Sequence, residues 1–354
     1  MTAFDANGLP DVVLLKIFKL LKFSDLCKAG RVCQRWYDLS RSQALWTSID
    51  ASDPEITASQ MEQLAGLLTP SVQRLHVTSS PRHCRLFLTA NALRDLRRRC
   101  PFLSTLIVDN ASLAVLNDYS SITVADLPPT LRTLSLRRSF FQADRFFALL
   151  AVQNLSVLDL SFCWCVSESD IPFLTQLPNL HELYLEQCEA IRDTGIALMV
   201  SHGRNLRILA VDGTRITDEA LRTIAENCTV LEKLYFGRTA VTDVGVSYLC
   251  TKGGHLPLRE LCLLQTCVSP EAAKSLLATF PHLGWFNFDQ PVDRTRRFSV
   301  RRRPWEFWEI CNHFLERGGL VVRGFQPQQY LLTHQRLWTQ CHAYDSSNKK
   351  QKNF

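Results

Sequence analysis

The sequence of 354 residues contains no uninterrupted apolar run of about eighteen residues, the length that a membrane-spanning helix needs. It opens with Met-Thr-Ala-Phe-Asp-Ala-Asn-Gly, which lacks the basic segment and the apolar core of a secretory signal. We therefore expect no membrane partner, and we expect the protein in the cytoplasm, the nucleus or both.

Motifs that carry enzyme chemistry are also missing. The sequence has no Gly-x-Gly-x-x-Gly, no phosphate-binding loop ending in Gly-Lys, no His-Glu-x-x-His and no Cys-x-x-Cys. The nearest groups of metal-binding residue types have spacings that fit no zinc site: Cys163-Trp-Cys165, and the set Cys311, His313, His334, Cys341 and His342. The sequence thus predicts no catalytic residue, no metal and no cofactor, and a protein that is not an enzyme.

Thirteen cysteines would suggest disulfides in a secreted chain. Their odd number, their dispersal and the missing secretory signal favour reduced thiols instead. The formal net charge is +6, and the excess of basic residues lies after residue 288. Because the rest of the chain is nearly neutral, nucleic acid is not a favoured partner.

The stretch Leu180-His-Glu-Leu183-Tyr-Leu185-Glu-Gln-Cys188 recurs along the chain with the same spacing of leucines. Clear copies begin at Leu155, Leu180, Leu206, Leu231 and Leu258, and looser copies begin at Val72, Leu103, Leu131 and Leu283. This period resembles the leucine-rich repeat, in which each unit is one short strand and a returning helix. The resemblance implies an α/β horseshoe-shaped solenoid, with parallel strands on the concave face and helices on the convex face.

Two further positions repeat with the same period. Hydroxyl residues suited to cap a helix follow the strands, namely Ser167, Thr217, Thr242 and Ser269, and Pro270 suits the first helical position. The eighth residue after each first leucine is small and polar: Cys163, Cys188, Thr214, Thr239 and Thr266. We expect these side chains to hydrogen-bond to the backbone at the turn after the strand.

Residues 9–50 lie outside the repeat period and predict three short helices. Leu14, Ile17, Phe18 and Leu21 recur at helical spacing after Pro10, which suits a first helical turn. A unit of about 40 residues is too small to bury all of its apolar side chains internally. The spacing alone leaves two interpretations open, a simple cap on the solenoid or a surface that binds a partner.

The motifs Leu9-Pro10, Val32-Cys33-x-x-Trp36 and Leu45-Trp46 resemble the F-box, and the chain is similar to the family of F-box/leucine-rich-repeat proteins. The sequence of 127–134, Leu-Pro-Pro-Thr-Leu-Arg-Thr-Leu, is similar to that of one particular member of this family. The resemblance implies that the segment binds the adaptor subunit of an SCF-type cullin ubiquitin ligase and, through it, the cullin and RING subunits. By this resemblance, the residues that contact the adaptor are Leu9, Pro10, Ile17, Val32, Cys33, Trp36 and Trp46.

The sequence divides into six predicted parts. They are an F-box at 4–50, a linker helix with a degenerate first repeat at 51–71, leucine-rich repeats at 72–288, a basic loop at 289–304, a C-terminal capping repeat at 305–325 and a partly disordered tail at 326–354. The basic stretch 294–303 is compatible with nuclear import, with phosphate binding or with a solvated insertion. A role in nucleic-acid binding would depend on this stretch.

The strand residues that alternate with the leucines should face outward on the concave side. Acidic and aromatic side chains gather there, which favours a basic protein segment as substrate: Asp159, Glu182, Tyr184, Glu186, Asp212, Tyr235, Glu260 and Trp285. The alternative is an ordinary solvated sheet face. With the F-box resemblance, the sequence predicts a substrate-recognition subunit that promotes ubiquitination and proteasomal degradation. An inhibitor or scaffold outside the ligase is the alternative function.

Overall fold

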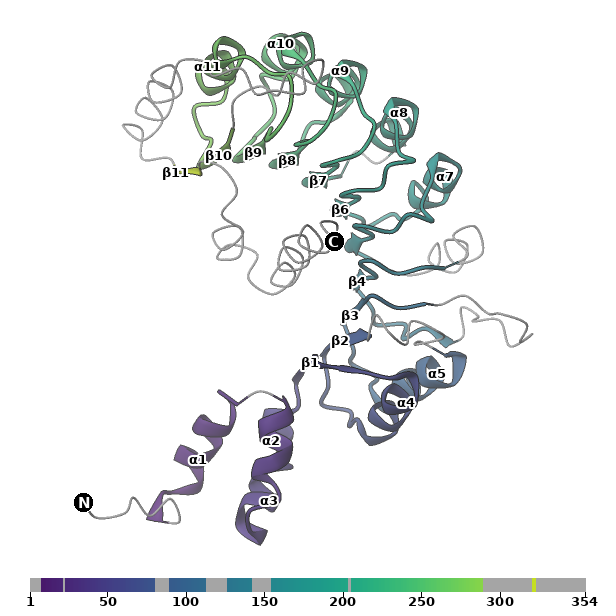
Figure 1. Cartoon of the computed structure of the whole chain (residues 1–354), viewed down its shortest axis with the longest axis vertical. Helices are drawn as coiled ribbons and strands as arrows, with labels where there is room; N and C mark the ends of the chain where they lie inside the picture. The colour runs from purple at the N-terminus through teal and green to yellow at the C-terminus, as the bar shows by residue number, and fades with distance from the viewer. Residues whose placement is uncertain are drawn as a thin grey trace, which may run out of the picture.

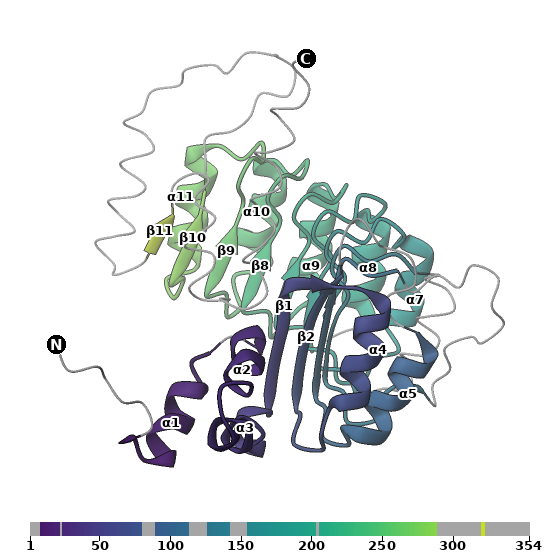
Figure 2. The ribbon, with the colours of Figure 1, turned by 60° about the horizontal axis from the view of Figure 1, so that its bottom comes forward.

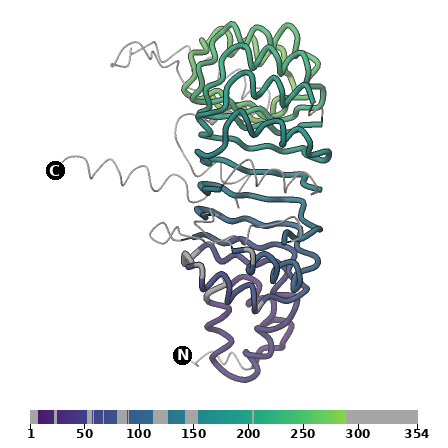
Figure 3. The backbone as a smooth tube through the Cα atoms, turned by 90° about the vertical axis from the view of Figure 1, so that its right-hand side faces the viewer, coloured from purple at the N-terminus to yellow at the C-terminus, as the bar shows by residue number. Residues whose placement is uncertain are grey.

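The computed structural model describes residues 8–21, 23–79, 89–112, 126–141, 154–202, 205–288 and 320–322. Three short helices at the N-terminus lead into a curved parallel sheet whose outer side is covered by helices (Figure 1). The successive repeats follow one another as turns of a coil along the long axis of the molecule (Figure 3). The predicted α/β horseshoe is confirmed.

The N-terminal helices are α1 (Asp11–Phe18), α2 (Phe23–Ala29) and α3 (Gln34–Ser40), followed by a short 3-10 turn, η2 (Gln43–Leu45). The described strands are β1 (Ser48–Ile56), β2 (Arg74–Ser79), β3 (Thr105–Asp109), β4 (Thr133–Ser135), β5 (Val157–Asp159), β6 (Glu182–Tyr184), β7 (Ile208–Ala210), β8 (Lys233–Tyr235), β9 (Glu260–Cys262), β10 (Trp285–Asn287) and β11 (Leu320–Val322). The described helices of the solenoid are α4 (Ala58–Leu67), α5 (Ala90–Arg99), η5 (Glu168–Asp170) with α7 (Ile171–Leu174), α8 (Asp193–His202), α9 (Asp218–Asn227), α10 (Asp243–Thr251) and α11 (Pro270–Thr279).

The strands form one sheet in which the spatial order is the order along the chain. All pairings between neighbours are parallel, and the register advances one repeat at a time, so that Val157, Glu182 and Ile208 lie side by side. Residues at the same place in the repeat therefore form rows that run across the sheet. This register makes the concave face a regular lattice of side chains.

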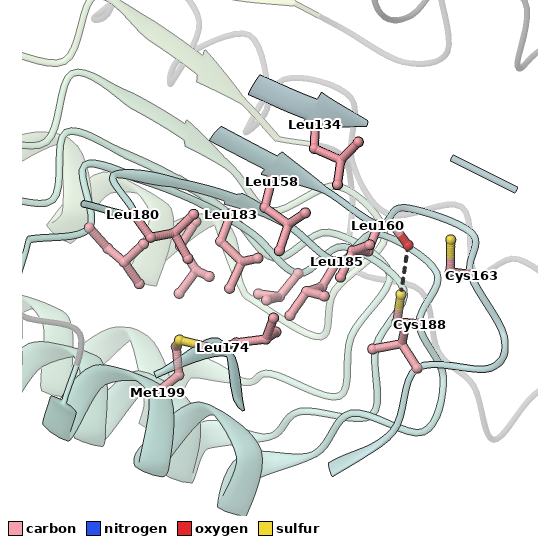
Figure 4. Packing of buried hydrophobic residues seen from close by; sticks show 14 of the residues in the cluster. Leu134, Leu158, Leu160, Cys163, Leu174, Leu180, Leu183, Leu185, Cys188 and Met199 are labelled. Carbon is pink, nitrogen blue, oxygen red and sulfur yellow. Dashed lines mark hydrogen bonds between the residues drawn. The ribbon is translucent and has the colours of Figure 1, made fainter. Parts of the chain in front are cut away.

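Leucines of the repeat motif build the core between the sheet and the helices (Figure 4). Leu158, Leu183 and Leu185 are fully buried, and Leu183 pairs with Leu158 of the preceding repeat and Leu209 of the following one. Burying one leucine side chain contributes about 1.5–3 kcal/mol. Because each repeat shares its leucines with two neighbours, no single repeat could bury this surface alone.

The seventh residue after each first leucine has a left-handed backbone conformation, with φ between 54° and 68°. This residue turns the chain from the end of the strand toward the outer side. These positions are Asn110, Arg138, Phe162, Gln187, Gly213, Arg238 and Gln265. A non-glycine residue costs about 1 kcal/mol in this region, so six of the seven turns carry strain that packing between repeats must offset.

The next residue closes each turn through the hydrogen bonds that the sequence predicted. Thr214 Oγ1 donates to the carbonyl of Val211 at 2.6 Å, and Thr239 and Thr266 make the same bond within their own turns. Cys188 Sγ donates instead to the carbonyl of Leu160 in the preceding repeat, at 3.3 Å (Figure 4). The cysteine thus ties one repeat to the previous one. These predictions are confirmed.

Carboxylates at the helix N-termini form a second link between repeats. Asp193 accepts hydrogen bonds from both the backbone nitrogen and the hydroxyl of Thr217, each at 2.7 Å. Asp218 accepts the same two bonds from Thr242, also at 2.7 Å. Thr217 and Thr242 are the predicted N-caps of α9 and α10, so each carboxylate fixes the start of the next helix.

The junction between the N-terminal helices and the solenoid depends on Trp46, which packs against the core of the repeats and against the smaller helical core. Its Nε1 donates to the carbonyl of Ser40 at 2.7 Å. Strand β1 follows directly and extends across the predicted boundary at residue 50, so the first repeat begins with a strand rather than a linker. Figure 2 shows α2 beside β1, with α4 and α5 on the outer side of the sheet. Predictions for 289–304, 305–325 and 326–354 fall outside the described residues, except for β11, which pairs with β10.

Replacing Asp218 with alanine should destabilise the protein by about 1–3 kcal/mol, because Thr242, the N-cap of α10, loses the two hydrogen bonds that it donates to Asp218. The matched control is Glu219→Ala, one residue further on, where the exposed pair with Arg222 should change stability by less than about 0.5 kcal/mol. Urea unfolding followed by circular dichroism measures both variants. Equal midpoints for the two variants would contradict the role of Asp218.

Candidate protein-binding surfaces

One face of α1 is apolar and exposed, although the helix packs its opposite face inward. Leu14 and Phe18 are buried, whereas Val13 and Ile17 lie exposed four residues apart, and Leu20, two residues beyond the end of α1, is 86% exposed. Residues with this spacing share one side of a helix. Val13, Ile17 and Leu20 form an apolar strip, and exposed apolar side chains on so small a unit are typical of a surface that contacts another protein.

The start of α1 is tied to α3. Arg35 donates to Asp11 Oδ1 through two nitrogens, at 2.6 and 2.9 Å, and also to the carbonyl of Leu9. Pro10 is the N-cap residue, and its carbonyl accepts from the backbone nitrogens of Val13 and Leu14. The Leu9-Pro10 motif therefore sets where α1 begins.

Among the predicted adaptor-binding residues, Pro10, Ile17, Val32 and Cys33 are exposed, and Val32 is 65% exposed. Trp36 is half-buried, with its ring packed edge-on against Phe18 at 5.2 Å between centroids. Trp46 is half-buried at the junction. The two tryptophans thus serve internal packing, and adaptor contact by any of the seven residues stays a prediction. The sequence analysis did not select Val13 and Leu20. They lie four residues before and three residues after Ile17, a helical spacing that could have identified them.

The concave face consists of three rows of side chains. The second, fourth and sixth positions after each first leucine form them, as predicted, and all eight candidate substrate-binding residues lie in these rows. The first row holds Glu182, Glu260 and Trp285; the second holds Asp159, Tyr184 and Tyr235; the third holds Glu186 and Asp212.

The eight candidates differ in accessibility. Asp159, Tyr184, Glu186 and Tyr235 are buried, and Glu186 is only 5% exposed. Glu182, Asp212, Glu260 and Trp285 are half-buried. The sequence predicted that all eight face the concave side but could not show this difference. Substrate binding by these residues stays a prediction.

An apolar cluster lies on the concave face, separate from the main core. It consists of Tyr184, Ile208, Ala210, Tyr235 and Cys262, and Val157, Leu264 and Trp285 pack against it. The phenol of Tyr184 donates to Glu182 at 3.0 Å, and that of Tyr235 donates to Glu260, which also pairs with Lys233. Aromatic rings with carboxylates at their edge are a common composition for a protein-binding surface.

Buried charges lie in the rows beside this cluster. Arg137 faces Asp159 at 3.8 Å, and both side chains are almost fully buried. Burial and the nearby carboxylate of Asp212 raise the pKa of Glu186 well above its usual range. Burial also raises the pKa of Asp212 to about 7, although its Oδ1 accepts a hydrogen bond from the backbone nitrogen of Gly237 at 2.9 Å. The two groups therefore release their protons at a higher pH than isolated carboxyl groups would.

A third polar group lies on the first strands of the sheet, where the sequence singled out no residue. His76 on β2 lies between two carboxylates, with Nδ1 3.3 Å from Asp50 and Nε2 3.0 Å from Asp109. Burial by itself would lower the pKa of His76, but the hydrogen bonds to Asp109 and Asp50 outweigh burial and raise this pKa to about 9. The imidazolium thus joins β1, β2 and β3. The repeat at Val72 matches the leucine motif only loosely. The sequence therefore gave no reliable register from which to predict the contact of His76 with Asp50 and Asp109.

Within the described ranges, no three His, Cys, Asp or Glu side chains are grouped so as to hold a metal ion. The part of the chain that the structure describes also contains no helix long and apolar enough to cross a membrane. The described surfaces include an apolar strip at α1 and, on the concave face, rows of aromatic and acidic side chains.

Comparison with known proteins supports this division. Residues 6–52 match the F-box-like family, a range that contains α1, α2, α3 and η2. The chain therefore carries an F-box-like domain joined to a leucine-rich-repeat solenoid.

The chain is homologous to F-box/LRR-repeat protein 12, the family member that the sequence of 127–134 resembles. It is 29% identical to the protein from Homo sapiens over 278 residues, which cover 74% of this chain and 80% of that protein. It is also 29% identical to the protein from Mus musculus over 241 residues, which cover 66% of this chain and 63% of that protein. A chain of the yeast Rad7 and Elc1 complex aligns with a TM-score of 0.42 and 16% identity, over 79% of this chain and 81% of that one.

The raised pKa of Asp212 predicts a stability that depends on pH. Since the folded state holds this proton up to about pH 7, the contribution of Asp212 to stability falls as the pH rises from about 4 to about 7. Asp212→Asn keeps an acceptor for Gly237 and removes the titration. The variant should therefore gain stability over the wild type at pH 8, on the order of 2 kcal/mol, and little at pH 4.

Thermal unfolding at pH 4, 6 and 8 measures this difference. The control is Glu189→Gln, an exposed carboxylate paired with Arg215, which should behave as the wild type does at each pH. A gain for Asp212→Asn that is the same at pH 4 and pH 8 would show that burial of this carboxyl has no effect on its titration.

Proposed function

We propose that this chain is the substrate-recognition subunit of an SCF-type cullin ubiquitin ligase, acting in the cytoplasm, the nucleus or both. The F-box-like domain would bind the ligase adaptor, and the solenoid would bind the protein substrate. The observation that carries the proposal is the exposed apolar strip of Val13 and Ile17 on α1 and Leu20 just beyond its end, which belongs to a domain packed on the solenoid through Trp46. An exposed amphipathic helix of this kind suits a hydrophobic groove on the adaptor.

The mechanism is positioning rather than bond formation. A rigid connection between adaptor and substrate raises the effective concentration of a substrate lysine near the ubiquitin-charged enzyme. The shared packing of Trp46 and the β1–β2 pairing supply that rigidity. In this proposal the cullin and RING subunits reach the chain only through the adaptor, and the chain transfers no ubiquitin itself.

The concave face favours a substrate with a basic segment. Glu182 and Glu260 are half-buried carboxylates of the first row, and Trp285 in the same row extends the aromatic cluster, with its ring 6.0 Å from that of Tyr235. A basic segment could pair with the accessible carboxylates while apolar side chains contact the rings. Glu186 is buried, so it offers little carboxylate surface to such a segment.

Val32→Arg should weaken binding of the purified adaptor subunit by tenfold or more, a loss of about 1.4 kcal/mol, because it places a charge in the apolar contact. Val32 is 65% exposed, so the change leaves the fold intact. The matched control is Val244→Arg on α10, which is 55% exposed and belongs to the solenoid. Isothermal titration calorimetry on the full chain measures both.

Equal adaptor affinity for the wild type and for Val32→Arg would show that Val32 does not contact the adaptor. Absence of adaptor binding by the wild type would end the ligase proposal, and an inhibitor or scaffold function of the solenoid would replace it.

Charge reversal on the concave face tests substrate binding separately. Glu182→Lys should lower the recovery of bound proteins about tenfold while leaving adaptor recovery unchanged, because like charges then face each other across the contact. Glu226→Lys, on the convex helix α9, is the control. Quantitative mass spectrometry of proteins that co-purify with each variant, scaled to the adaptor, measures the effect. The same bound proteins at the same levels in all three samples would place the substrate elsewhere.

A further inference from the structure

Lysine is distributed unevenly along this chain. Of the forty lysine and arginine residues, ten are lysine, or one in four, so nineteen basic positions would include about five lysines at that ratio. Residues 29–232 contain nineteen arginines and no lysine, whereas residues 1–28 contain four lysines and no arginine. The lysine-free stretch runs from the end of α2 to the residue before β8. The choice between the two basic residues therefore changes at defined places in the fold.

Some arginines of this stretch make contacts that only a guanidinium offers. Arg35 donates from two nitrogens to Asp11 and also donates to the carbonyl of Leu9. Arg222 pairs with two carboxylates of its own helix, α9. The ammonium of a lysine is a point charge and would not reproduce these forked contacts. At such positions the geometry of the contact explains the arginine.

Other arginines of the stretch make contacts that a lysine could make equally well. Three of them contact a carboxylate through one nitrogen and keep more than half of the side chain exposed: Arg98 with Asp95 at 3.1 Å, Arg207 with Glu232 at 3.3 Å and Arg215 with Glu189 at 3.5 Å. Outside the stretch a lysine makes the same kind of exposed pair, since Lys28 lies 3.0 Å from Asp25. Such pairs contribute little to stability. Stability therefore does not explain the arginine at these three positions.

The three positions also lie on different sides of the solenoid. Arg98 belongs to α5 on the convex side, Arg207 directly precedes β7, and Arg215 lies between β7 and α9 (Figure 1). Arginines that bind one anionic partner gather on one face. A single basic binding site therefore does not account for them either.

Lysine and arginine differ in the reaction of a ubiquitin ligase, so this inference rests on the proposed function. Ubiquitin is carried as a thioester on a cysteine of the conjugating enzyme. The neutral amine of a lysine attacks the thioester carbonyl, a carbon–nitrogen bond replaces the carbon–sulfur bond, and one proton of the amine passes to the departing sulfur. A guanidinium keeps its proton and has no free electron pair to attack with. Arginine therefore retains the positive charge but does not accept ubiquitin.

We propose that the lysine-free stretch 29–232 protects the chain from ubiquitination by the ligase to which it belongs. A chain bound to the adaptor is held near the conjugating enzyme just as its substrate is, so its own lysines would react at a high effective concentration. The described lysines of the solenoid lie from β8 onward. Lys233 on the concave face is only 22% exposed, with its Nζ 2.7 Å from Glu260, whereas Lys252 and Lys274 lie in the repeats at the end away from the F-box-like domain (Figure 1).

The test adds lysines to the stretch without changing its charge. The lysine variant combines Arg98→Lys, Arg207→Lys and Arg215→Lys, and the matched control combines Arg98→Gln, Arg207→Gln and Arg215→Gln, which remove the same guanidiniums without adding an amine. Each full-length chain is assembled with purified adaptor, cullin and RING subunits. It is then incubated with ubiquitin, the activating and conjugating enzymes and ATP, in the absence of substrate.

We expect the lysine variant to be ubiquitinated about tenfold faster than the wild type, because the added amines react within the same complex. Immunoblotting of the chain over time measures the rate, and mass spectrometry should locate ubiquitin at position 98, 207 or 215. The glutamine control should react at the rate of the wild type, since these exposed changes have little effect on stability.

Equal rates for the lysine variant and the wild type, with the adaptor bound to both, would overturn this inference and leave the ligase proposal intact. A glutamine control that reacts as fast as the lysine variant would overturn it too, because the loss of arginine and not the new amine would then be the cause. A wild-type chain that does not bind the adaptor would overturn both proposals. Adaptor occupancy, measured in the same samples, distinguishes these results.

Discussion

The stacking of buried leucines between neighbouring repeats is the interaction on which the rest of this structure depends. Leu158 and Leu183 have no exposed surface, and each repeat relies on the next to cover its leucines. The parallel register between strands follows from this packing, because a shift by one residue would turn the leucines to the concave side. Neighbouring repeats are also joined at two other places. One is the turn after the strand, through the hydrogen bond of Cys188, and the other is the helix N-terminus, where carboxylates accept hydrogen bonds from Thr217 and Thr242.

The same register creates the functional surface. Strands about 4.8 Å apart bring the outward side chains of successive repeats into contact. Tyr184 and Tyr235 thereby join an apolar cluster. Burial raises the pKa of Asp212, and burial together with the neighbouring Asp212 raises the pKa of Glu186. A flat, solvated sheet would have left these groups independent. Because side chains on the concave side pack closely, some polar residues of these rows are buried and others remain partly exposed.

The two ends of the molecule differ in how they bury their apolar side chains. The solenoid buries its apolar side chains against neighbouring repeats, whereas the F-box-like domain is too small to do so and leaves Ile17 and Leu20 exposed. Trp46 contacts both cores, so the exposed strip has a defined position relative to the concave face. This arrangement suits a protein that holds two partners at a fixed separation. The imidazolium of His76 adds a bond across β1, β2 and β3, directly beside that junction.

The sequence by itself determined the repeat, the direction of the strands, the helix caps and the faces of residues such as Glu182, because leucine spacing and capping residues act within a single repeat. It also identified the F-box through motifs close together in the chain. The depth at which Asp159 and Glu186 lie and the internal role of Trp46 were decided only by the tertiary structure. So was the contact of Asp50, His76 and Asp109, since these residues lie 26 and 33 positions apart in the chain. Burial and pairing between repeats depend on which side chains the stacked strands bring together, and no local pattern records this.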